Sequence, residues 1–258
     1  MPRPFTGVIL AAGMGTRLGE MTRDIPKPLL AVNGKPLIAY GTDWMRAAGA
    51  ERVVVVGGYR IEQLRAFLSA HDPDVIVAEN PDFATTQRMV SLLAAEPHVT
   101  GDLLVQDGDY IFTRAAAEAL EQDPPETIVV HGTRRRDACW SAMDVIIRTA
   151  ADGSMTDIFK TSGTQPLGTG EYYFNSQAFW PADAVAPFFR HARALIAARG
   201  PVLHVEDALM EYVRHGKSVN VRPIETGYWV EVDTPSEKEA AERFAAAYLN
   251  DLPNACPR

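Results

Sequence analysis

Cysteine is scarce in this sequence of 258 residues, which contains only Cys139 and Cys256. Two cysteines so far apart exclude a disulfide framework and a CxxC metal site, and we expect both to be plain thiols. Long apolar runs are also missing, since none approaches the ~18 residues that a membrane helix needs. The apolar stretch near the N-terminus is too short for a signal peptide. We therefore expect a cytoplasmic protein that does not bind membranes.

Positive charge is in deficit as well, because 25 Lys and Arg face 33 Asp and Glu and give a formal net charge of −8. A long-range field of this sign excludes broad binding to nucleic acid or anionic lipid, so a polyanion would need a local cationic pocket. The six histidines show no metal-ligand spacing such as HxxxH, and we assign them no chemistry. The 47% hydrophobic and 22% charged content is ordinary for a globular enzyme, which we expect to form a single domain over 1–258.

The N-terminal half alternates strand-like and helix-like segments. Short apolar runs rich in β-branched residues, typical of strands buried on both faces, lie at 7–12, 52–58, 74–80, 102–109 and 127–132. Two amphipathic stretches between them, 36–49 and 61–68, have helical spacing. The alternation predicts an α/β fold, a three-layer sandwich around an open, mainly parallel sheet.

The pattern changes from about residue 140. Residues 143–160 predict two strands joined by an Asp-Gly turn, and 170–175, 218–224 and 227–233 predict further strands. Helical periodicity at 183–200 and 204–216 ends in each case on a glycine. A last helix, 234–249, begins with Thr234 as N-cap and Glu237 at N3, which predicts a capping box. We expect residues of about 135–225 to form a smaller β-rich region, inserted into or appended to the main fold.

A glycine-rich, cationic loop follows the first predicted strand in "LAAGMGTRLGEMTRDIPKPLL", residues 10–30. Gly13 and Gly15 could present backbone N–H groups to an anion, although glycines alone also suit a tight turn. Arg17 could bind phosphate oxygens, and Lys27 could neutralise the charge that spreads over a triphosphate under attack. Prolines on both sides of Lys27 restrict its backbone, which favours a catalytic role over a solvated one. The loop lacks the third glycine of a dinucleotide-binding fingerprint, which argues against a dehydrogenase.

This segment resembles the signature of the sugar-phosphate nucleotidyltransferase superfamily, GxGTRL followed by PKPL. Within it, "ENPDFATTQRMVSLLAA", "VEDALMEYV" and "YWVEVDTPSEKEAAE" are most similar to the choline-phosphate and 2-aminoethylphosphonate cytidylyltransferases. The resemblance implies a Rossmann-like nucleotidyltransferase fold and an enzyme that transfers a nucleotide from a nucleoside triphosphate to a small phosphate or phosphonate, releasing pyrophosphate. It implies Mg²⁺ as cofactor and, on the resemblance alone, CTP as donor. Two alternative functions stay open, namely a sugar-1-phosphate nucleotidyltransferase and a catalytically silent nucleotide-sensing module. The protein could also be a homodimer.

The same resemblance implies roles for individual residues. Arg17 and Lys27 would be catalytic, with Lys27 at the α-phosphate and the attacking oxygen. The nucleotide would be bound by Leu10, Ala11, Ala12, Gly13, Gly15, Thr16, Arg17 and Gln87. Asp109 and Asp233, each at the end of a predicted strand, would hold Mg²⁺, which prefers carboxylate oxygens. Asp107 and Glu231 are nearby alternatives.

The region 135–225 would supply the acceptor side of the cleft. Lys160 matches the position of a lysine that meets the acceptor phosphate in relatives, although an exposed lysine at a strand end is an equally good interpretation. An aromatic box for an ammonium group is a second expectation, with core packing as its alternative. Its members would be Trp140, Tyr172, Tyr173 and Trp180, assisted by Glu171 or Asp144.

One helix departs from those cytidylyltransferases. Where they tend to have two asparagines, this chain has Gln87 and Arg88. Arg88 could bind an additional acidic group of the acceptor, or it could face solvent. Three consecutive arginines at 134–136 are interpreted as a solvated loop, with contact of one of them with the nucleotide or a partner subunit as the alternative.

Overall fold

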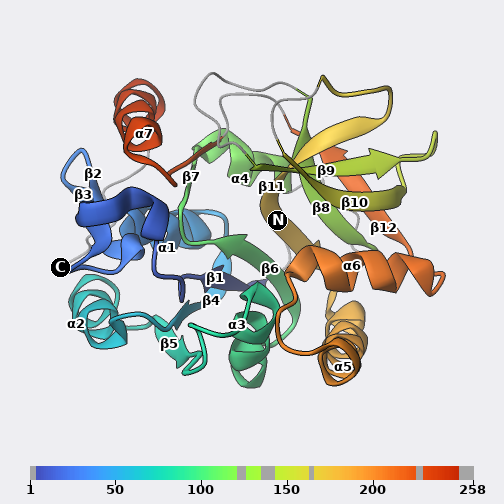
Figure 1. Ribbon diagram of the computed structural model, residues 1–258, viewed down its shortest axis with the longest axis horizontal. Helices are drawn as coiled ribbons and strands as arrows, with labels where there is room; N and C mark the ends of the chain where they lie inside the picture. The colour runs from blue at the N-terminus through green and yellow to red at the C-terminus, as the bar shows by residue number, and fades with distance from the viewer. Residues whose placement is uncertain (1–3, 121–125, 135–142, 163–165, 225–228, 250–258) are drawn as a thin grey trace.

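A nine-stranded sheet runs through the computed structural model, which describes residues 4–120, 126–134, 143–162, 166–224 and 229–249 (Figure 1). The strand order is β10-β9-β11-β6-β1-β4-β5, and β8 pairs with β11 and β12. The strands are β1 Phe5–Leu10, β4 Ala50–Gly57, β5 Ile76–Glu79, β6 Asp102–Asp107, β8 Ile128–Thr133, β9 Met143–Thr149, β10 Met155–Ser162, β11 Glu171–Trp180 and β12 Val219–Pro223. Two small sheets pair β2 Ala31–Val32 with β3 Lys35–Pro36, and β7 Tyr110–Phe112 with β13 Trp229–Glu231.

The half of the sheet formed by β6, β1, β4 and β5 is parallel, as predicted. In this register Leu10 lies opposite Val56 of β4 and Asp107 of β6. Valine, isoleucine and leucine fill β1 and β4 because both faces of these strands are buried. Parallel strands end at a common edge, so the loop after Leu10 and the residues after Asp107 come together there.

The other half of the sheet is built on β11, which pairs antiparallel with β6, β8 and β9. Strands β9 and β10 form the predicted hairpin, and Gly153 in its turn has a φ of 85°. The β-rich region therefore continues the main sheet through the pair β11–β6. Strand β11 is irregular between Phe174 and Ala178, where Ser176 has a φ of 59°.

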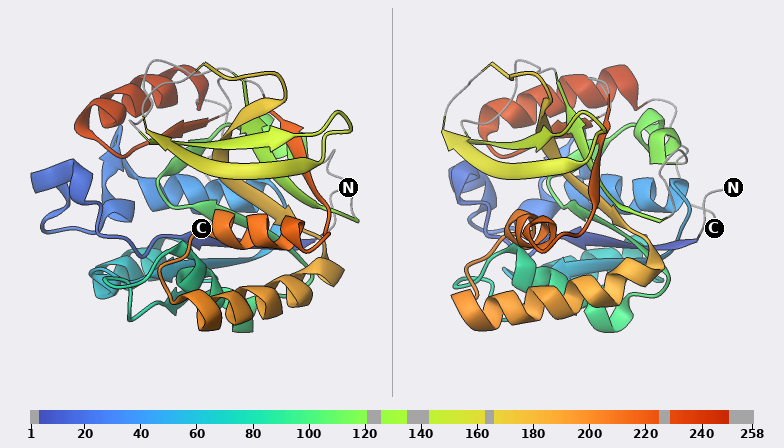
Figure 2. Two further views of the ribbon diagram at one scale, coloured as in Figure 1. Left: turned by 45° about the vertical axis from the view of Figure 1, so that its right-hand side comes forward. Right: turned by 90° about the vertical axis from the view of Figure 1, so that its right-hand side faces the viewer.

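Helices cover both faces of the sheet and give the predicted three layers. The α-helices are α1 Leu37–Ala47, α2 Ile61–His71, α3 Arg88–Ala95, α4 Arg114–Leu120, α5 Ala182–Arg199, α6 Val205–Arg214 and α7 Pro235–Tyr248, and the short 3-10 helices are η1 Thr16–Thr22, η2 Lys27–Leu29 and η3 Glu96–His98. Val8 and Leu10 pack with α3 and α5 on one face, whereas Ile9 packs with α1 and α2 on the other, because successive strand side chains alternate. In Figures 1 and 2, α3 and α5 lie below the sheet and α7 lies above it.

None of the helices in the described part of the chain combines the length and the apolar run that crossing a bilayer takes.

The start of α7 differs from the predicted capping box in one bond. The Thr234 hydroxyl accepts the N–H of Glu237 at 3.3 Å, as expected for an N-cap. The Glu237 carboxylate, however, accepts the N–H of Asp233 at 2.8 Å. Glu237 therefore fixes the backbone of Asp233, and the cap of α7 becomes part of the support of that residue.

Candidate active site

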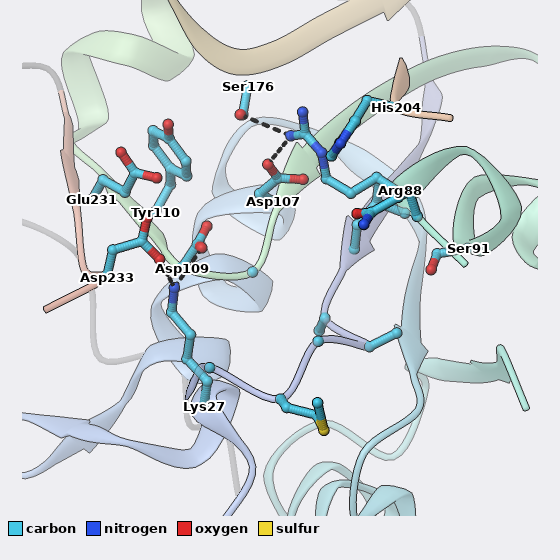
Figure 3. Close-up of a pocket in the computed structure, with 18 of the residues that line it drawn as sticks. Lys27, Arg88, Ser91, Asp107, Asp109, Tyr110, Ser176, His204, Glu231 and Asp233 are labelled. Atoms are coloured by element: carbon cyan, nitrogen blue, oxygen red, sulfur yellow. Dashed lines mark hydrogen bonds and ion pairs between the residues drawn. The ribbon is translucent and has the colours of Figure 1, made fainter. Parts of the chain in front are cut away.

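A cleft of about 670 Å³ opens at the carboxyl edge of the parallel strands. Its walls come from the loop after β1, the ends of β6 and β13, the N-termini of α3 and α6, and strands β10 and β11. Figure 3 shows two groups of charged side chains in it. Lys27 lies with Asp109, Glu231 and Asp233 in one group, and Arg88 lies with Asp107 in the other.

The glycine-rich loop forms one wall of the cleft and packs against Lys27. Gly15 has a φ of 66°, and a Cβ atom there would lie 2.7 Å from the Cβ of Lys27, so glycine is required on two grounds. At Gly13, by contrast, no described residue other than its chain neighbours lies within 4 Å of a Cβ. The Thr22 hydroxyl donates to the carbonyl of Gly15 at 2.9 Å and closes the loop. All residues assigned to the nucleotide from the sequence line the cleft, namely Leu10, Ala11, Ala12, Gly13, Gly15, Thr16, Arg17 and Gln87.

Lys27 is buried at the foot of this loop and bridges two carboxylates. Its Nζ lies 2.6 Å from Asp109 Oδ2 and 2.5 Å from Asp233 Oδ1. Burial alone would lower the pKa of Lys27, but the two adjacent carboxylates outweigh it and raise that pKa above its ordinary value. Lys27 is therefore a permanent cation. Arg17 adds a second one, with Nη2 2.5 Å from Asp233 Oδ2.

Asp109, Glu231 and Asp233 form an acidic group whose ligand atoms lie within 4.8 Å of one another. Two observations fit a cation here. The buried Oδ1 of Asp109 has no hydrogen-bond partner among the described residues. Burial, and then repulsion from the two aspartates, raise the pKa of Glu231 well above its ordinary value. Carboxylate oxygens are the ligands of a hard divalent cation, so the residues present suit a metal.

Of the two alternative ligands considered from the sequence, Glu231 belongs to this acidic group, whereas Asp107 does not. Asp107 is instead ion-paired with Arg88. Burial raises the pKa of Asp107 to about 6 in spite of that partner.

Arg88 lies at the N-terminus of α3 and is not solvated, which rules out the expectation that it faces solvent. Its guanidinium forms ion pairs with Asp107 and Glu206 and donates to the Ser176 hydroxyl at 3.1 Å. The left-handed backbone of Ser176 belongs to the irregular part of β11 that lies against Arg88. We call Arg88, Asp107, Glu206 and Ser176 the Arg88 cluster.

Lys160 of β10 also lines the cleft. It has no ion pair or hydrogen bond with another described residue, and burial lowers its pKa. A partly buried cation without a partner at the wall of a cleft is suited to bind an anion. Lys160 is nevertheless exposed, so the structure fits both interpretations made from the sequence.

Glu171, which we expected to bind the acceptor, lies elsewhere in the structure. It lies directly opposite Arg148 of β9, and its carboxylate accepts from that guanidinium at 2.8 Å and from the N–H of Gly168 at 2.8 Å. It is not among the described residues that line the cleft. The cross-strand partner holds this carboxylate at the strand end.

The structure does not bring the described residues of the expected aromatic box together. Trp180 is fully buried and packs on Phe188 at 5.0 Å, so it belongs to the core. Tyr172 lies beneath the guanidinium of Arg134 at 5.7 Å, and Tyr173 alone of the three described aromatics lines the cleft. Trp140 lies outside the described residues, as do Arg135 and Arg136 and the two cysteines; exposed Arg134 fits the predicted loop.

A model of the MobA-like NTP transferase domain matches residues 7–202, more than half of the chain. The chain belongs to this family. The chain is 29% identical over 255 residues to the CMP-5'-(3-aminopropyl)phosphonate synthase of Streptomyces rubellomurinus. That alignment covers 94% of the chain but 39% of the relative, so the chain spans well under half of the relative's length.

Two further similarities cover nearly the whole MobA-like chain. The UTP–glucose-1-phosphate uridylyltransferase AglF of Haloferax volcanii is 25% identical over 248 residues, 92% of the chain and 94% of that protein. The solved CTP:phosphocholine cytidylyltransferase of Streptococcus pneumoniae superimposes with a TM-score of 0.75 at 21% identity, over 92% of the chain and 97% of that structure. This likeness confirms the predicted nucleotidyltransferase fold.

Several residues that line the cleft were not found from the sequence. They are Asn80, Ser91, Ser176, His204 and Glu206. Asn80 follows β5 as the aspartates follow β6 and β13, so its strand-end position was a usable signal. Glu206 lies in a segment that predicts a helix, and nothing in that periodicity indicates that it meets Arg88.

Proposed function

We propose that this protein is a Mg²⁺-dependent nucleotidyltransferase that transfers CMP from CTP to the phosphate or phosphonate of a small acceptor and releases pyrophosphate. The observation that carries the proposal is the bridge of Lys27 between Asp109 and Asp233 at the foot of the glycine-rich loop. Membership of the MobA-like NTP transferase family supports the reaction class. CTP as donor is supported by the relative that makes a CMP-phosphonate.

In this mechanism the protein positions two anions and neutralises them, and it supplies no covalent nucleophile. A phosphate or phosphonate oxygen of the acceptor attacks the α-phosphorus of CTP, and the bond to the β-phosphate oxygen breaks. Lys27 and Arg17 stabilise the negative charge that spreads over the phosphates as this happens. The acceptor oxygen is already ionised, so no general base is needed.

Asp109 and Asp233, together with Glu231, would hold Mg²⁺, and their buried carboxylate oxygens fit that ion. When bound, Mg²⁺ neutralises triphosphate oxygens. Because Lys27 shares both aspartates, its ammonium is kept next to the position of the phosphates. The backbone from Leu10 to Gly15 would bind the nucleotide.

The acceptor would lie on the opposite wall, within the region 135–225 of a single domain. Lys160 supports this placement, since its partly buried ammonium lacks a partner among the described residues and suits an anionic oxygen. Arg17 and Lys160 would thus bind the donor and the acceptor phosphates separately.

The test is a pyrophosphate-release assay with Mg²⁺ that combines CTP, UTP, dTTP or GTP with phosphonates, phosphocholine and glucose 1-phosphate. We expect turnover with CTP and a phosphonate or phosphocholine, and a product with a P–O–P anhydride bond, either pyrophosphate or phosphonate–phosphate, by ³¹P NMR. Turnover confined to UTP and glucose 1-phosphate would instead favour the activity of AglF, which aligns over almost the full length of both chains. Binding of CTP without turnover across the whole panel would indicate a sensing module.

A further inference from the structure

The Arg88 cluster has one guanidinium and two carboxylates, and Lys160, which also lines the acceptor side of the cleft, balances its net negative charge. Its guanidinium is paired with two carboxylates that come from different elements, Asp107 at the end of β6 and Glu206 in the first turn of α6. A guanidinium between two carboxylates has no charge left over for a further acid. These ion pairs therefore argue against the expectation that Arg88 binds a second acidic group of the acceptor.

One atom of this cluster lacks a partner. Glu206 is 4% exposed and lines the cleft, and its Oε2 is buried with no hydrogen-bond partner among the described residues. A buried carboxylate oxygen without a hydrogen-bond donor costs free energy, because its hydrogen bonds to water are lost and no protein hydrogen bond replaces them. A bound ligand that donates a hydrogen bond to Glu206 Oε2 would remove this cost.

The surroundings of that oxygen select the kind of donor. An ammonium group brings a full positive charge and three N–H donors, but the carboxylates Asp107 and Glu206 are already balanced by the cations Arg88 and Lys160, which both interact electrostatically with Glu206. The added charge would therefore have no counterion. A carboxylate brings no donor and would face Glu206 and Asp107. A hydroxyl group brings one donor for Glu206 Oε2 and lone pairs that can accept from Lys160 Nζ.

We propose that the acceptor carries a neutral hydroxyl group close to its phosphate or phosphonate, and that this hydroxyl donates to Glu206 Oε2. The proposal rests on the proposed function, since it describes the acceptor of that same reaction. It assigns Arg88 a role in specificity: by occupying Asp107 and Glu206, its guanidinium takes the place that a cationic acceptor would need. The substrate class is then hydroxyalkyl phosphonates or phosphates.

The experiment compares kcat/KM for matched acceptors with CTP and Mg²⁺ as constant partners. The acceptors are 2-hydroxyethyl-, 2-aminoethyl- and carboxymethylphosphonate, with 3-hydroxypropyl- and 3-aminopropylphosphonate as longer homologues. We expect each hydroxyl compound to exceed its charged counterparts by about tenfold or more. An amino or carboxyl compound that reacts as well or better overturns the inference while the proposed function stands. No turnover with any phosphonate or phosphate overturns both.

A second experiment tests whether a substitution of Arg88 changes the preference between acceptors. Arg88→Gln releases both carboxylates, so the ratio of kcat/KM for the amino over the hydroxyl acceptor should rise about tenfold. Arg193→Gln is the matched control, because Arg193 pairs with Glu96 away from the cleft, and the ratio should not change. An unchanged ratio in Arg88→Gln, with circular dichroism and melting showing a folded protein, overturns the inference. If that variant does not fold, the wild-type comparison decides alone.

Discussion

Replacing Lys27 with methionine should destabilise the protein strongly when no divalent cation is present. The substitution keeps the length of the side chain but removes the charge between two carboxylates whose side chains are only 21% (Asp109) and 5% (Asp233) exposed. Removing one partner of a buried ion pair costs about 3–5 kcal/mol, because the remaining charges lose a buried counterion. With about 2.1 cal/mol/K per residue of unfolding entropy, the 258 residues correspond to roughly 0.5 kcal/mol/K. The melting temperature should therefore fall by about 6–9 °C.

The assay is thermal melting in EDTA and in saturating Mg²⁺, followed by turnover with CTP. Mg²⁺ should recover more stability in Lys27→Met than in the wild type, because the cation pairs the carboxylates that the variant leaves unpaired. Turnover at saturating CTP and Mg²⁺ should still fall by about 10²-fold or more, since a preorganised cation is lost from the transition state.

Lys35→Met is the matched control, because Lys35 pairs with Asp43 on another part of the molecule and is 31% exposed. A partly exposed pair of this kind contributes about 1 kcal/mol or less, so its melting temperature should move by no more than about 2 °C. A Lys27→Met variant that melts like Lys35→Met, or that gains nothing extra from Mg²⁺, would refute the reasoning about the buried bridge.

Four further substitutions test the site. Asp109→Asn and Asp233→Asn should each lower turnover by at least about 10²-fold while circular dichroism stays that of the wild type; near-normal turnover in either would remove that residue from the metal site. Gly15→Ala should lower the free energy of unfolding in denaturant by about 1–2 kcal/mol, because it strains a left-handed backbone. It should also slow turnover, because the new Cβ would lie 2.7 Å from Lys27 and displace it. Gly13→Ala, with open space at its Cβ, is the control, and equal losses in the two variants would contradict the packing argument. Glu171→Gln should leave the KM of the acceptor unchanged, since its carboxylate is bound by Arg148; a severalfold rise in that KM would return Glu171 to the acceptor site.

Local patterns predicted much of the fold. Strands β1, β4 and β6 are buried on both faces. Such strands consist of apolar, often β-branched residues, so they can be recognised in the sequence as short apolar runs. The helix N-cap at Thr234 and the glycine after α5 are equally local, because each depends on the conformation of a few neighbouring residues. The glycine-rich loop belongs to the same class, since the left-handed φ of Gly15 is a property of one residue.

The sequence by itself determined which side chains stand at strand ends and loops, and hence the candidates for binding phosphates and a metal. Only the tertiary structure decided their partners. Asp233 reaches Asp109 because β13 pairs with β7, and Arg88 meets Glu206 because α6 begins beside α3. The carboxylate of Glu171 is bound by a cross-strand arginine and does not line the cleft. Ion pairs of this kind join segments far apart in the chain, and their charges interact through space, so no local pattern specifies which of several possible partners is used.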